Sequence, residues 1–116
     1  MKRLKPLIFV MFLSLGIFSA TAQEENDCNI RYNLFRGDAK AKNYDAAYEN
    51  WMWCMDNCPT LSVNIYKIGI KIAEDRYNKA AEADKAEALA LIKRVYEQRL
   101  EHYPKDAGKV YSDYAV

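Results

Sequence analysis

After Cys28 the apolar residues of this chain recur at intervals of three or four, and polar residues fill the positions between them. This spacing is typical of amphipathic α-helices. Alternating apolar and polar positions, which would indicate strands, do not occur, and the chain has only 4 glycines. We therefore predict an all-α fold with helices over residues 30–41 and Tyr44–Asn57, a third helix after Pro59 and a fourth that ends near His102.

Local signals mark the ends of these helices. Asn43 is suited to cap the second helix, and Thr60 or Ser62 the third. Asp84 and Glu87 have capping-box spacing at the start of the fourth. The third helix is apolar on two sides, so we expect it to be sandwiched between neighbours. The residues expected to face inward are Ile30, Leu34 and Phe35 in the first helix, Tyr44, Ala47, Trp51 and Cys54 or Met55 in the second, Leu61, Ile65, Ile68, Ile72, Val63, Tyr66, Ile70, Ala73 and Tyr77 in the third, and Leu89, Ile92, Tyr96 and Leu100 in the fourth.

The N-terminus, residues 1–22, has the composition of a secretory signal peptide. A basic start, MKRLKP, precedes an apolar run from Leu7 to Phe18 and an A-x-A cleavage site that ends at Ala22. The apolar run is too short for a transmembrane helix, which needs roughly 20 residues. We expect cleavage after Ala22 and no transmembrane segment afterwards. A bacterial periplasm is the expected location, with outer-membrane association or secretion from the cell as alternatives.

Charge excludes one class of partner. The full chain carries 17 basic and 16 acidic residues, and cleavage would remove Lys2, Arg3 and Lys5 but no acid. The mature chain would then have a net charge of about −2, which does not supply the strongly basic face that nucleic acids require. We therefore expect no nucleic-acid partner. The length of the mature chain suits one small domain.

The order of helix, short turn, helix and proline occurs twice. The stretch LFRGDAKAKNYDAAYENWMWCMDNCP resembles a tetratricopeptide repeat, and LALIKRVYEQRLEHYP repeats its ending. The resemblance implies antiparallel helix hairpins that stack as a short right-handed solenoid, with two pairs over residues 30–104. A short extension, 23–29, would precede them, and residues 105–116 would begin a further helix. The residues that carry the resemblance, and that would pack the repeats, are Leu34, Tyr44, Ala47, Trp51, Cys54, Pro59, Tyr96, Leu100 and Pro104.

The three cysteines raise two alternatives. Cys54 and Cys58 lie four residues apart and share a helix face, but a structural zinc site needs four ligands, and His102 is the only histidine. Cys28 and Cys58 are equally far from Asn43, so an antiparallel hairpin turning there would bring them together at its open end. We expect a Cys28–Cys58 disulfide, with Cys28–Cys54 or no disulfide as the alternatives.

No nucleophile with its base, carboxylate pair or phosphate-binding loop is recognisable, so we predict no enzyme activity, catalytic residue, cofactor or metal. The resemblance implies a protein or peptide partner, or a place in a larger envelope complex. A thiol- or metal-dependent protein that uses Cys28, Cys54 and Cys58 is the alternative function. We expect Trp51 to touch the third helix near Ile65 or Ile68. The candidate partner-binding residues are Tyr32, Arg36, Asn64, Lys67 and the outward-facing Trp53.

Overall fold

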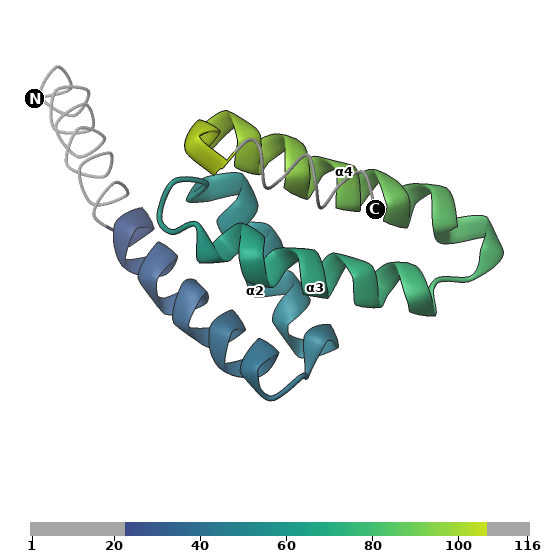
Figure 1. Cartoon of the computed structure of the whole chain (residues 1–116). Helices are drawn as coiled ribbons and strands as arrows, with labels where there is room; N and C mark the ends of the chain where they lie inside the picture. Colours follow the sequence, from purple (N-terminus) through teal and green to yellow (C-terminus); the bar gives the residue numbers. More distant parts are fainter. Residues whose placement is uncertain (1–22, 107–116) are drawn as a thin grey trace, which may run out of the picture.

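A computed structural model of the chain describes residues 23–106, and every regular element in that range is helical. The predicted signal peptide and the predicted start of a further helix after residue 106 lie outside the described residues. Within 23–106, no helix is long and apolar enough to cross a membrane. The elements are a first helix over 23–40, α2 (Tyr44–Asn57), α3 (Asn64–Lys79), a 3₁₀ turn η1 (Glu82–Asp84), α4 (Lys85–His102) and a second 3₁₀ turn η2 (Pro104–Asp106) (Figure 1).

The predicted ends of α2 and the predicted end of α4 are confirmed, but the first helix extends further than expected. Residues 23–29, predicted as an extension, are helical. The first helix ends in a Schellman motif, in which Lys42 has a positive φ of 60° and Asn43 N–H donates to Asp38 O at 2.8 Å. Asn43 and Asp84 occupy the N-cap positions of α2 and α4, as predicted, but neither side chain makes a capping hydrogen bond. Val63 precedes α3 directly, and Ser62, one of the two predicted capping residues, accepts from the Asn64 N–H at 3.1 Å through its hydroxyl.

The core lies along α3, which contacts both α2 and α4 (Figure 1). Its two apolar sides explain this position, because one helix can bury two stripes only between two neighbours. Burying a large apolar side chain stabilises the fold by about 1.5–3 kcal/mol. The buried apolar residues are Phe35, Ala47, Trp51, Cys54, Met55, Cys58, Ile65, Tyr66, Ile72, Ala73 and Val95.

Trp51 fills the space between α2 and α3. Its side chain is 0% exposed, and its indole Nε1–H donates to Ile65 O at 2.9 Å, at the place where contact was predicted. Gly69 lies directly against the indole. A Cβ added there would lie 2.7 Å from Trp51 Cε2 and 2.8 Å from Cζ2, closer than real Cβ atoms approach other atoms. Glycine at this position therefore allows α3 to approach the tryptophan.

Two inward faces differ from the prediction. Leu34 is 52% exposed and Phe35 fully buried, so the predicted packing role of Leu34 is wrong. The two residues are adjacent in one helix, and only one of them can point at the same neighbour. On α4, Leu89 is 49% exposed, whereas Val95 and Arg99 are buried. The inner face of α4 is thus displaced from the predicted stripe, of which Ile92, Tyr96 and Leu100 are partly buried.

The remaining predicted packing positions lie near the ends of the helices. Tyr44 and Pro59 are partly buried, whereas Pro104 is exposed where α4 gives way to η2. Cys28 and Cys58 form a disulfide with a Cα–Cα distance of 6.0 Å. This bond ties the first helix to the end of α2, as the equal spacing from Asn43 predicted.

Candidate functional site

The predicted partner face joins the first helix to the start of α3. Tyr32 OH donates to Ser62 Oγ at 3.1 Å and accepts from Asn64 Nδ2 at 3.2 Å. The Arg36 guanidinium lies 5.2 Å from the centroid of the Tyr32 ring. Lys67 is exposed and takes no part in this cluster. The polar atoms of Tyr32 and Asn64 thus bond to the chain itself, and the network braces two helices.

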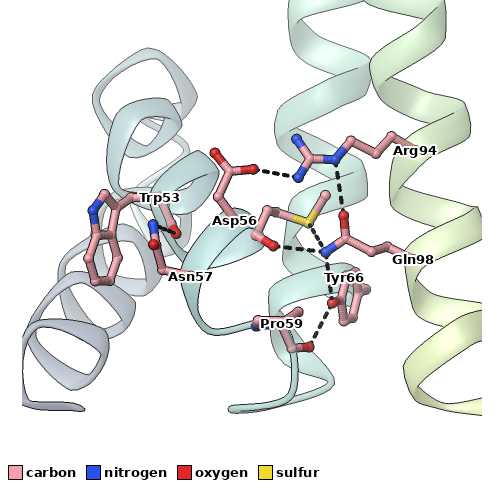
Figure 2. A network of polar contacts seen from close by, with 8 residues as sticks. Trp53, Asp56, Asn57, Pro59, Tyr66, Arg94 and Gln98 are labelled. Atoms are coloured by element: carbon pink, nitrogen blue, oxygen red, sulfur yellow. Dashed lines mark hydrogen bonds and ion pairs between the residues drawn. The ribbon is translucent and has the colours of Figure 1, made fainter. Parts of the chain in front are cut away.

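Trp53 is only partly open to solvent. Figure 2 shows its indole on the side of α2 that faces away from α4. Arg31, from the first helix, places its guanidinium 4.7 Å from the centroid of the ring and also donates to Asn50 Oδ1 at 3.2 Å. The prediction that Trp53 faces outward for a partner is therefore corrected, because Arg31 of the first helix lies over its ring.

A groove of about 530 Å³ lies on the side of the molecule formed by α2, the end of α3 and α4. No sequence motif indicated it, although its α2 wall, Asp45, Tyr48 and Met52, is a second stripe at helical spacing, one residue along from the Trp51 stripe. This second stripe is the sequence feature from which the groove could have been predicted. The residues that line the groove are Asp45, Tyr48 and Met52 from α2, Arg76, Lys79 and Ala80 from α3 and its end, and Asp84, Glu87, Ala88, Ala90, Leu91 and Arg94 from η1 and α4.

Arg94, which lines one end of the groove, belongs to a network of polar contacts around Gln98 (Figure 2). Gln98 Nε2 donates to Met55 O at 2.9 Å and to Tyr66 OH at 3.2 Å, and its Oε1 accepts from Arg94 Nε at 3.0 Å. Arg94 also pairs with Asp56 at the end of α2. Burial raises the pKa of Tyr66, whose hydroxyl donates to Pro59 O at 2.6 Å. These bonds connect α4 to α2 and α3 at this end.

The other end opens between Asp45 on α2 and Asp84 at the start of α4. Here the Arg76 guanidinium stacks on the Tyr48 ring, 3.5 Å from its centroid. Within residues 23–106 no carboxylate forms an ion pair with Arg76, whereas Lys79 pairs with Asp75 at 3.1 Å and Asp45 at 3.7 Å. The hydrogen bond to Asp75 and the charge of Asp45 raise the pKa of Lys79.

The middle of the groove is apolar, and its rim carries separated charges. Met52 from α2 and Leu91 from α4 are partly buried, line the groove and pack against the core. On the α4 rim, Asp84 and Glu87 are exposed and form no ion pair with a basic residue in the described part of the chain. The groove therefore offers an apolar floor between one stacked cation and two acids.

The cysteines are arranged for packing. Cys28 and Cys58 are joined, and Cys54, one turn before Cys58, is a buried free thiol with Cys28 O at 4.0 Å from its sulfur. Burial raises the pKa of Cys54 to about 11, against a smaller opposing effect of the Arg31 charge. The thiolate, which is the reactive and metal-binding form, is thus scarce at neutral pH. Among residues 23–106 no group of three or more His, Cys, Asp and Glu side chains is placed to hold a metal ion.

Comparison with known proteins finds no family model that matches the chain, and neither the curated proteins nor the solved structures contain a match to it. The arrangement of the groove is therefore the main guide to function.

Proposed function

We propose that this protein is a non-catalytic protein-binding module of a bacterial cell envelope, and that it holds its partner in the groove between α2 and α4. The observation that carries this proposal is the form of the groove. Beyond Arg94 at one end, Gln98 connects α4 to α2 and α3; Met52 and Leu91 supply apolar lining, and the other end presents Arg76 on an aromatic ring. Concave sites with an apolar floor and a few well-placed polar groups are typical binding sites.

Three further observations support a location in the cell envelope. The apolar start of the chain and the A-x-A site favour export, and a disulfide suits an oxidising compartment. We also propose that the two hairpins stack as a short tetratricopeptide-like solenoid. The support for this arrangement is that α3 packs between α2 and α4, with Trp51 filling the space between successive hairpins and small Ala47 buried beside it.

The test is site-specific photocrosslinking in cells that express the full chain. A benzophenone amino acid placed at Ala88, which lines the groove, should crosslink to a partner, because its side chain would be within reach of a bound segment. Ala86 lies on the same helix, is exposed and does not line the groove, so it is the matched control. Lys67 reports on the face formed by the first helix and α3.

The outcomes separate three readings. A crosslinked species at Ala88 that is missing at Ala86 supports the groove as the binding surface. Crosslinking at Lys67 without crosslinking at Ala88 would move the binding surface to the other face and refute the groove. Complete lack of crosslinking at all three positions would count against a binding module.

A further inference from the structure

We infer that the groove recognises a peptide segment of its partner that carries a carboxylate, and that the guanidinium of Arg76 binds this carboxylate. This inference rests on the proposed function and names the chemistry of the partner. Arg76 and Tyr48 come from different helices, and both line the open end of the groove. Their stacking at 3.5 Å is the central observation.

The position of Arg76 is suited to anion binding. A planar guanidinium presents its N–H donors at its edges, so stacking one face on a ring leaves these donors available for a bidentate carboxylate. Tyr48 is itself supported from behind, because its ring lies 6.2 Å from the centroid of buried Trp51. The cation is therefore held before any ligand arrives, and less conformational entropy is lost on binding.

The neighbouring charges single out Arg76 among the cations of the groove. Lys79 is already paired with Asp75 and Asp45, and Arg94 with Asp56. Arg76 has no such partner in the described part of the chain. An incoming carboxylate would consequently meet one cation that forms no ion pair with a described residue.

The opposite rim limits what the rest of the partner segment can be. Asp84 and Glu87 would repel a run of acids and favour a basic residue beside them. Met52 and Leu91 lie between the two rims and suit an apolar side chain. The complementary segment thus has an acidic residue for Arg76, an apolar residue for the floor and a basic residue near the start of α4. A polyanion does not meet this requirement.

The experiment selects short random peptides displayed on phage against protein purified after expression of the full chain. The enriched peptides are then synthesised and their affinities measured by fluorescence anisotropy. We expect enriched sequences to contain Asp or Glu together with an apolar residue. Arg76→Gln should weaken their binding by about tenfold or more, since a hydrogen bond to a charged group contributes about 1.5–3 kcal/mol. Lys71→Gln makes the same charge change on an exposed part of α3 outside the groove and should leave affinity within about twofold.

A charge reversal sharpens the test. The Arg76→Glu variant should lose the acidic peptides but bind versions in which Lys replaces the acid better than the wild-type protein does. Circular dichroism of each variant checks that the helices remain formed. If the selected peptides bind Arg76→Gln as tightly as wild type, or if basic peptides are selected instead, the inference is overturned while peptide binding itself stands. If no peptide is enriched, both the inference and the proposed function fail.

Discussion

Replacing Gly69 by alanine tests the closest contact in the core. Alanine is normally the better residue inside a helix, by about 1 kcal/mol. At this position, however, the added Cβ would lie 2.7 Å from Cε2 of Trp51. The indole cannot move aside easily, because it is fully buried and donates a 2.9 Å hydrogen bond to Ile65 O. The steric cost and the helix propensity therefore oppose each other.

The expected size of the effect follows from these two terms. Overpacking a well-filled core costs about 1–3 kcal/mol. If the indole shifts enough to break its bond to Ile65 O, about 1 kcal/mol more is lost. The gain of about 1 kcal/mol in helix propensity offsets part of this cost. We expect Gly69→Ala to lower the free energy of unfolding by about 1–3 kcal/mol, a large share of the roughly 5–10 kcal/mol available to a small domain.

Gly37 is the matched control. It lies in the first helix, and an added Cβ would meet nothing within 4 Å, so Gly37→Ala should stabilise the protein by about 0.5–1 kcal/mol. Urea unfolding followed by circular dichroism, with the disulfide intact, measures both variants. The same Gly69→Ala change is then made in a Trp51→Leu background, which removes the indole. There it should become neutral or stabilising, because only the helix propensity remains.

Two results would refute this reasoning. Stabilisation by Gly69→Ala to the same extent as Gly37→Ala would mean that α3 and the indole are not in close contact. An equal loss from Gly69→Ala in the wild-type and Trp51→Leu backgrounds would mean that the cost arises elsewhere than in the tryptophan.

Three further predictions concern other parts of the core and the network around Gln98. Trp51→Ala should lower the free energy of unfolding in urea by about 3–5 kcal/mol, whereas Trp53→Ala, beneath the partly buried Arg31, should lower it by under about 1 kcal/mol. The reverse order would mean that Trp51 is not the core tryptophan. Gln98→Ala should lower the free energy of unfolding by about 1–3 kcal/mol, because it removes a donor from buried acceptors. Arg94→Ala should lower it by under about 1 kcal/mol. Equal shifts of the thermal midpoint for the two variants would mean that Gln98 does not brace the helices. Burial raises the pKa of Cys54 from 9.0 to about 11, so the thiol ionises at lower pH in the unfolded chain than in the folded one. Its contribution to the free energy of unfolding is therefore complete below about pH 9 and is lost as the pH rises through 11. A Cys54→Ala variant should lack this loss of about 2–3 kcal/mol, and parallel pH profiles for the two proteins would contradict it.

The ends of α2 and the place of Trp51 could be read from the sequence because strong local signals coincide there. Asn43 precedes the helix, Pro59 follows it, and buried Ala47, Trp51 and Cys54 lie on one face at helical spacing. The pairing of Cys28 with Cys58 followed from the same hairpin. Such features depend on short-range geometry, which the order of residues largely determines.

The inner face of α4 could not be read in this way. Its pattern of Leu89, Ile92, Tyr96 and Leu100 suggested one stripe, but Arg99 and Val95 are the buried residues. A periodicity count treats Gln98 and Arg99 as outward-facing because they are polar. In the structure the Gln98 amide makes hydrogen bonds to groups on α2 and α3, so burial costs little there.

The groove depends on still longer-range geometry. Its lining residues are spread from Asp45 to Arg94, and the angle between α2 and α4 decides whether they face a common space. Each local signal belongs to a single helix, so none of them specifies that angle. The stacking of Arg76 on Tyr48 joins residues that have no recognisable relation in the sequence.

Stability and recognition can therefore be separated in this fold. Trp51, Gly69 and the Cys28–Cys58 bond hold the hairpins together from inside, and none of them lines the groove. Arg76 is half-buried and contributes one stacking contact, worth about 0.5–2 kcal/mol, so its replacement should leave most of the stability intact. A loss of binding in Arg76→Gln would then report on the surface that meets the partner. A loss of binding in Trp51→Ala would report only that the helices lining the groove are no longer held in their native arrangement.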